Sequence, residues 1–122
     1  MRLIIVGSLG DQLSTASKIA INNGAKVTHA PDEETALKLI RAKGADLLMV
    51  DVQMNIADLI KQLEKERIST PIVACGVGND SDAAVAAIKA GAKEYIPLPP
   101  DPELIAAVLT AISTDDHEFI YR

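Results

Sequence analysis

Short apolar segments alternate with longer amphipathic segments five times along this chain of 122 residues. The short segments are rich in Val, Ile and Leu, as buried strands are, and the longer ones carry apolar residues at helical spacing. Leu47 to Val50 is continuously apolar, which is typical of a central parallel strand covered on both faces. The alternation therefore predicts an α/β fold, a five-stranded parallel sheet in the order 2-1-3-4-5 with helices on both faces.

Turn and capping residues give the expected boundaries, because polar residues begin helices and glycines end them. The predicted strands are 3–6, 25–29, 46–51, 71–75 and 94–98, and the predicted helices are capped by Asp11, Asp32, Asn55, Asp80 or Ser81, and Asp101. From Ser113 onward the periodic pattern stops. We expect residues 1–113 to form one domain and residues 114–122 to begin a linker.

Composition excludes several classes of function. A net charge of -5 argues against direct contact with nucleic-acid phosphates, which requires clustered Lys and Arg. A single cysteine, Cys75, excludes an intramolecular disulfide and a Cys-based zinc cluster, and neither His29 nor His117 has companions at ligand spacing. No apolar run approaches the roughly 20 residues of a membrane helix. We expect a cytoplasmic protein without metal or cofactor, with Cys75 buried and both histidines at the surface.

The strand order is flavodoxin-like, and it places any site at the carboxyl ends of strands 1 and 3. The stretch from Val77 to Leu109 predicts a helix, a strand, a Pro-rich turn and a helix, and it resembles the last third of a response-regulator receiver domain. That resemblance implies a phosphorylation pocket with two acidic residues after strand 1, an aspartate after strand 3, a hydroxyl after strand 4, and an aromatic and a lysine on strand 5. The carboxylates hold Mg²⁺, which neutralises the incoming phosphoryl oxygens.

Only part of that pocket has counterparts here. Asp51 stands at the phosphoacceptor position and Tyr95 at that of the aromatic. Gly7 and Ser8 stand in place of the acidic pair. Gly76 stands in place of the hydroxyl, and Leu98 in place of the lysine. A lone carboxylate would leave Mg²⁺ with nearly all its waters and the transferring group with little stabilisation. We therefore expect Asp51 to accept hydrogen bonds from loop N–H groups without being phosphorylated, and the domain not to be an enzyme.

Three longer runs are more specific: GADLLMVD at 44–51, PIVACG at 71–76, and AIKAGAKEYIPLPPDPELIAAVL at 87–109. They resemble the receiver-like N-terminal domain of FlbD-type flagellar transcription activators. Such activators also carry an ATPase domain, which acts on RNA polymerase bound to the sigma factor RpoN, and a helix-turn-helix DNA-binding domain. No Walker motif or basic recognition helix occurs in this sequence. The resemblance implies that residues 114–122 lead to the absent ATPase domain, and that a partner, the flagellar assembly regulator FliX, controls the activator.

The partner surface is expected on the last helix, strand and helix. Its residues are the exposed ones of 83–89, 93–96 and 103–107, among them Lys89, Lys93, Tyr95 and Glu103. Ala-rich helix faces allow another helix to approach closely, and a homodimer is also possible. A partner that prefers one arrangement of these elements would shift the population without phosphorylation.

Three alternatives stay open at the level of sequence. The domain could be a phospho-accepting switch that uses Asp51, with Asp11 as the only further acid nearby in sequence. It could be the pseudo-receiver of a pilus-assembly ATPase, which would share this fold. It could also bind a small anion between the glycine-containing loops 7–10 and 76–79, although few aromatics lie near these loops to hold a flavin ring.

Overall fold

The computed structural model describes residues 2–7, 11–77, 81–98 and 101–121, without the side chains of 11–13, 77, 81, 98 and 112–121. Strands and helices alternate from one end to the other. They are β1 (Arg2–Val6), α1 (Asp11–Asn22), β2 (Lys26–Ala30), α2 (Glu33–Lys43), β3 (Leu47–Asp51), α3 (Ile56–Lys65), β4 (Ile72–Val77), α4 (Ser81–Ala90), β5 (Glu94–Leu98) and α5 (Pro102–Tyr121).

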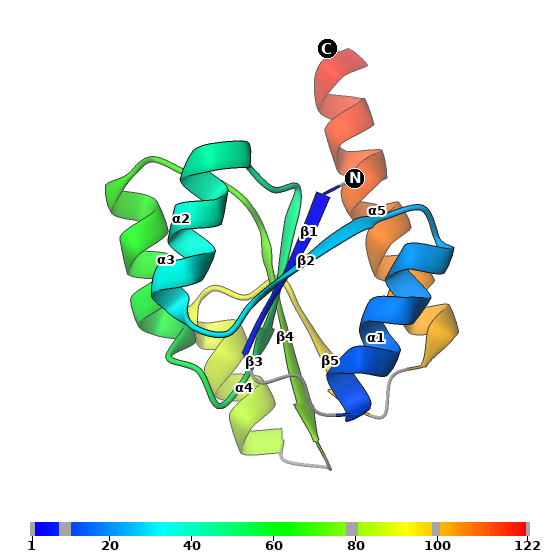
Figure 1. The fold of residues 1–122 in the computed structure, drawn as a ribbon, viewed down its shortest axis with the longest axis horizontal. Helices are drawn as coiled ribbons and strands as arrows, with labels where there is room; N and C mark the ends of the chain where they lie inside the picture. Colours follow the sequence, from blue (N-terminus) through cyan, green and yellow to red (C-terminus); the bar gives the residue numbers. More distant parts are fainter. Residues whose placement is uncertain (1, 8–10, 78–80, 99–100, 122) are drawn as a thin grey trace.

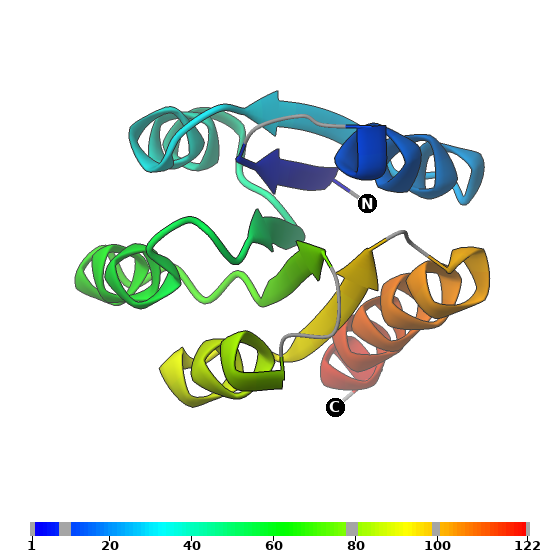
Figure 2. The ribbon, with the colours of Figure 1, turned by 90° about the horizontal axis from the view of Figure 1, so that it is seen from below.

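The sheet confirms the predicted topology. Its five strands are parallel and follow the order β2-β1-β3-β4-β5. The register places Val6 beside Val50 and Asp51 beside Cys75, so β1, β3 and β4 end at a common edge. Helices α1 and α5 cover one face of the sheet and α2, α3 and α4 cover the other (Figures 1 and 2).

Each face of the sheet has its own hydrophobic core. Leu3, Leu47, Met49 and Ile96 point toward α1 and α5, whereas Leu48, Val50 and Ala74 point toward α2, α3 and α4. Side chains alternate between the faces because successive residues of a strand point to opposite sides. Both cores are almost entirely aliphatic, as the scarcity of aromatic residues predicts.

Polar caps begin three of the helices at predicted positions. Asp32 accepts a hydrogen bond from the N–H of Thr35, and Asn55 accepts one from the N–H of Asp58, at 2.7 and 3.0 Å. Asp101 accepts the N–H of Glu103 at 2.9 Å. These side chains satisfy backbone donors that the first helical turn leaves without an intrahelical partner.

Two boundaries differ from the sequence interpretation. β4 runs to Val77, two residues past the predicted end, because its residues 73–77 pair with the whole of β5. α5 continues to Tyr121 although the apolar periodicity stops at Ser113. Residues 113–121 contain neither Gly nor Pro, so nothing in this polar segment interrupts the helix. The domain boundary at 113 and the linker role of 114–122 stay predictions.

Candidate functional site

Asp51 ends β3 at the carboxyl edge of the sheet. Its side chain is half-buried, and its Oδ1 accepts the backbone N–H of Gln53 at 2.9 Å. The next residue, Val52, donates its N–H to the carbonyl of Cys75 at 2.8 Å, which ties the loop after β3 to β4. The aspartate therefore has the local hydrogen bond that the sequence predicts for a structural role.

Gly7 occupies the position of an acidic residue in the implied pocket. Its φ of +130° is strained for any residue with a side chain, and an added Cβ would lie 2.7 Å from the Cβ of Asp51. Its N–H donates to the carbonyl of Ala30 at 2.9 Å and its carbonyl lies 2.6 Å from Nε2 of His29. An acidic side chain at position 7 would require movement of the backbone.

Gly76 lies next to the end of β4, opposite Pro97 of β5. An added Cβ there would lie 2.2 Å from the hydroxyl oxygen of Tyr95 and 2.8 Å from Cγ2 of Val52. The Tyr95 hydroxyl thus lies where a side chain at position 76 would begin. Tyr95 is half-buried and packs against the core on the side of α2, α3 and α4. In this structure the aromatic on β5 is already turned toward the carboxyl end of β4.

Two predicted site positions lie wholly or partly outside the described residues. Ser8 is not described, and Leu98 is described only as the last residue of β5. Their assignment as replacements for an acid and for a lysine stays a prediction from sequence.

The donors present do not fit Mg²⁺. Hard cations prefer several carboxylate or carbonyl oxygens, and a receiver site supplies three acidic residues. Among the residues that the structure describes, no three His, Cys, Asp or Glu side chains gather as metal ligands. Beside Asp51, the first position of the acidic pair is a glycine, and a side chain added there would collide with the Cβ of the aspartate.

Cys75 and His29 lie close to the same edge. Cys75 is fully buried, as predicted, and burial and then the charge of Asp51 raise the pKa of its thiol to about 12. Its thiolate is therefore scarce at neutral pH. His29 is half-buried and hydrogen-bonded to the Gly7 carbonyl, so its assignment as an ordinary surface residue is wrong. The sequence pattern missed this contact because it joins two different strand ends.

The predicted partner surface lies on α4, β5 and α5. β5 is an edge strand with α4 on one face and α5 on the other (Figure 2). Lys89, Lys93 and Glu103 are exposed, as the prediction requires. Two apolar residues of α4 that the sequence interpretation did not single out, Val85 and Ile88, are 51% and 46% exposed.

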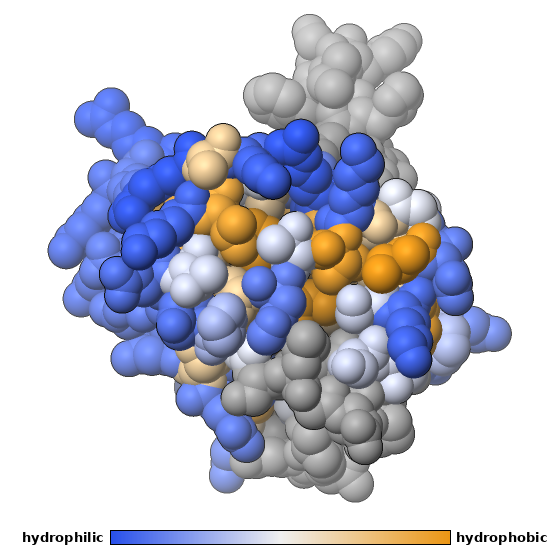
Figure 3. Space-filling view, in the orientation of Figure 1, coloured by the Kyte–Doolittle hydropathy of each residue, from blue (hydrophilic) through white to orange (hydrophobic). Residues whose placement is uncertain are grey.

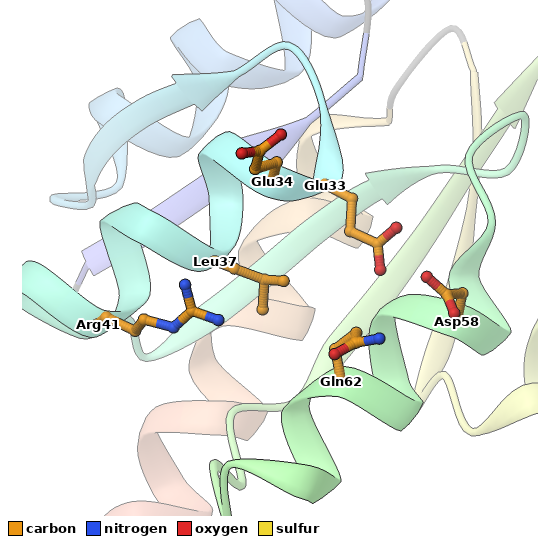
Figure 4. Close-up of a pocket in the computed structure, with 6 residues that line it drawn as sticks. All are labelled: Glu33, Glu34, Leu37, Arg41, Asp58 and Gln62. Atoms are coloured by element: carbon orange, nitrogen blue, oxygen red, sulfur yellow. The ribbon is translucent and has the colours of Figure 1, made fainter.

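A pocket of about 230 Å³ lies between α2 and α3, away from Asp51 (Figure 4). Its wall brings Glu33 of α2 opposite Asp58 of α3. The pKa of Glu33 is raised from 4.5 to about 6 by burial, then by its hydrogen bond and repulsion with Asp58. At the other end Arg41 of α2 forms a two-pronged ion pair with Glu66, with both N–O distances at 2.6 Å. Sequence reasoning missed both pairs because the partners are on different helices.

The order of the strands, the aspartate that ends β3 and the aromatic on β5 define a receiver-type α/β domain. The chain belongs to the response regulator receiver domain family, whose model matches residues 4–110. In the part of the chain that is described, no helix is long and apolar enough to cross a bilayer.

Two transcriptional regulators are similar in sequence to this chain. The chain is 56% identical over 123 residues to the transcriptional regulatory protein FlbD of Caulobacter vibrioides, covering all of this chain and 27% of FlbD. It is 36% identical over 81 residues to the DNA-binding transcriptional regulator NtrC of Escherichia coli, covering 63% of this chain and 17% of NtrC. The chain thus spans about a quarter or less of the length of these relatives.

A solved structure shows the same fold. NtrX from Brucella abortus, crystallised with ADP, superposes with a TM-score of 0.85 at 21% identity, covering 98% of this chain and 28% of the NtrX chain.

Proposed function

We propose that this receiver domain regulates a flagellar transcription activator through contact with a partner protein, without Mg²⁺-dependent phosphorylation of Asp51. The observation that carries the proposal is the placement of Tyr95 in the space beside Gly76. In an ordinary receiver a hydroxyl at that position draws the loop inward on phosphorylation, and the aromatic follows. Here no hydroxyl is present at 76 and the aromatic already occupies the space, so a phosphoryl group on Asp51 would have little to change.

The Gly7 contact supports the same conclusion. Phosphoryl transfer needs positive charge near the developing phosphate, which receivers obtain from Mg²⁺ and a lysine. Gly7 gives no carboxylate for Mg²⁺ and its contact with Asp51 leaves no room for one. The domain acts as a binding and regulatory module and not as an enzyme.

The partner surface of the proposal combines α4, β5 and α5. Val85 and Ile88 expose apolar side chains three positions apart on α4, and Lys89 and Lys93, close to them in sequence, are also exposed. By the likeness to FlbD, the partner is the flagellar assembly regulator FliX. A homodimer through the same surface would compete with that partner.

The whole protein, by the same likeness, is a cytoplasmic activator whose ATPase domain acts with RpoN-bound RNA polymerase. This domain controls that ATPase domain and does not itself contact DNA. Its net charge of -5 fits that division of roles.

The test is an NMR titration of the 122-residue chain with Mg²⁺ plus beryllofluoride in one series and purified FliX in the other. Beryllofluoride mimics an aspartyl phosphate. We expect no saturable shifts around Asp51 and Tyr95 with the mimic, and saturable shifts over α4, β5 and α5 with FliX. Saturable shifts at Asp51 with the mimic would support the phospho-accepting alternative and contradict the proposal.

Matched variants locate the partner surface. The double variant Val85→Lys, Ile88→Lys should lose FliX binding, because it places two charges in the apolar contact. Ile21→Lys is the control, since Ile21 is 53% exposed on α1 and lies outside the proposed surface. Equal binding by both variants would place the partner elsewhere.

A further inference from the structure

A second pocket lies at the amino ends of the strands, at the end of the sheet opposite Asp51. Its volume is about 240 Å³, and β1, β2 and the end of α2 form its walls. Three basic residues, Arg2, Lys26 and Lys43, line it together with the apolar residues Ile4 and Leu39, and the Leu3 side chain points to the other face of the sheet. We call it the amino-end pocket. Figure 3 shows the face of the molecule that is drawn in Figure 1, where an apolar area near the middle of the view is bordered by hydrophilic surface.

The three basic residues come from separate elements, β1, β2 and α2. The guanidinium of Arg2 donates a hydrogen bond to the backbone carbonyl of Lys43, which holds it against the end of α2. Because the acceptor is a neutral carbonyl and not a carboxylate, this contact does not offset the positive charge of Arg2.

Negative groups near the pocket do not cancel these charges. The ion pairs within the described residues are Lys38 with Glu34 and Arg41 with Glu66, and neither involves a basic residue of the pocket. Asp46 lies close by, but its Oδ2 accepts the backbone N–H of Arg2 at 2.7 Å. The end of α2 adds a partial negative charge of about one half. Three positive charges against one carboxylate and this partial charge leave a net positive site in an acidic chain.

The volume and the charge of the amino-end pocket favour one class of ligand. A phosphate monoester carries close to two negative charges at neutral pH and accepts hydrogen bonds from Arg and Lys, whereas a carboxylate carries one charge. Thr28, which also lines the pocket, adds a hydroxyl. The apolar floor favours an organic group on the phosphate. The volume is below the roughly 300 Å³ at which pockets for drug-sized ligands begin, so the ligand is small.

We propose that the amino-end pocket binds a small phosphate monoester through Arg2, Lys26 and Lys43, with its organic group against Leu39 and Ile4. The site is independent of the function proposed above, because it shares no residue with Asp51 or with the surface on α4, β5 and α5. It gives the domain an input from a phosphorylated small molecule at the end of the sheet where receivers are not phosphorylated.

The experiment is an NMR titration of the 122-residue chain with three probes: phenyl phosphate, inorganic phosphate and phenylacetate. We expect saturable amide shifts at Lys26, Thr28 and Gly44 with phenyl phosphate. Affinity for phenylacetate should be about tenfold weaker, because it carries one charge in place of nearly two. Inorganic phosphate should also bind more weakly, because it leaves the apolar floor uncovered.

Two charge-matched variants make the test specific. Lys26→Gln with Lys43→Gln should weaken phenyl phosphate binding about tenfold or more. Lys61→Gln with Lys65→Gln removes the same charge from exposed positions of α3 and should leave binding unchanged. Shifts that do not saturate, or equal losses in the two double variants, would show attraction to general surface charge and overturn the proposal. Equal affinity for inorganic phosphate and phenyl phosphate would overturn the role of the apolar floor.

Discussion

Gly7 and Gly76 both lie at the carboxyl ends of strands and both leave no room for a side chain, but the atoms that exclude it differ. At Gly7 the nearest atom is the Cβ of Asp51, which cannot move without its backbone, and the φ of Gly7 is +130°. At Gly76 the nearest atom is the hydroxyl oxygen of Tyr95, at the tip of a rotatable side chain. The half of the edge formed by β1 and β3 is therefore fixed, whereas the half formed by β4 and β5 can adjust.

Under the function proposed above, this difference separates the two parts of an ordinary receiver pocket, the metal site and the conformational switch. The fixed half is where Mg²⁺ would be held, and its geometry resists the return of an acidic side chain. The adjustable half is where the conformational switch would act, and there a side chain could return if Tyr95 rotated away. A side chain should consequently be harder to introduce at position 7 than at position 76.

The largest effect is expected from Gly7→Ala. It should lower the free energy of unfolding by about 3 kcal/mol, because backbone strain and overpacking against Asp51 add. Urea unfolding followed by circular dichroism measures the change. The control is Gly44→Ala, at a φ of +75° with nothing within 4 Å of the added Cβ, which should cost only about 1 to 2 kcal/mol for the strain alone. Equal costs at the two positions would mean that the Asp51 contact is not tight.

Gly76→Ser should cost less, about 1 to 2 kcal/mol, because Tyr95 can rotate outward to relieve the contact. The Tyr95 ring signals in NMR should shift toward those of an exposed tyrosine. In a Tyr95→Leu background the same substitution should cost less still, since the atom that it meets has been removed. If the serine costs as much in that background, Val52 and not Tyr95 limits the space at Gly76.

The sequence predicts the frame of this edge but not its contacts. Strand order follows from the alternation of apolar runs and helices, and the positions of Asp51, Gly7 and Gly76 at strand ends follow from counting along those runs. What counting cannot give is which atoms meet. The Gly7 contact joins β1 to β3, and the Tyr95 contact joins β5 to β4. Both depend on the register and twist of the assembled sheet.

The same limit applies to charge. The amphipathic pattern places Glu33 in the first turn of α2 and Asp58 in the first turn of α3, where acidic residues are favourable. Only the packing of α2 beside α3 brings the two carboxyl groups together. In the final helix, the sequence pattern missed a regular element. The extension of α5 to Tyr121 lacks the apolar periodicity that marks an amphipathic helix in a sequence.

Glu33→Gln tests whether the carboxyl pair between α2 and α3, away from both glycines, destabilises the fold. Glu33 has a pKa of about 6 in the folded chain against 4.5 ordinarily, so its favourable contribution is complete below pH 4.5 and is lost as the pH rises through about 6. Above that pH the variant should be more stable than the parent by about 1 kcal/mol, after allowance for solvent screening of a partly exposed pair. The difference should shrink toward pH 4.5.

Urea unfolding at a series of pH values from 4.5 to 7.5 measures this difference. Glu34→Gln is the matched control, because Glu34 is exposed on the same turn and pairs only with Lys38 across one helical turn. Its effect should stay nearly constant over that range. A pH-independent difference for Glu33→Gln would show that the Glu33 and Asp58 carboxyl groups are too well solvated to interact.

The smallest effect is expected at Arg67, a left-handed residue that is not glycine and lies between α3 and β4, away from the carboxyl edge. Arg67 has a φ of +58° at the end of α3, and its N–H donates to the carbonyl of Glu64 at 3.0 Å. Arg67→Gly should relieve about 1 kcal/mol of backbone strain in the folded chain. Glycine also gives the unfolded chain more conformational freedom, so the free energy of unfolding should rise by only about 0.5 kcal/mol. Arg67→Ala keeps the strain and removes the same side chain, so its urea midpoint should not rise. An equal rise for alanine would assign the gain to the lost arginine side chain. The left-handed backbone at position 67 would then not be a source of strain.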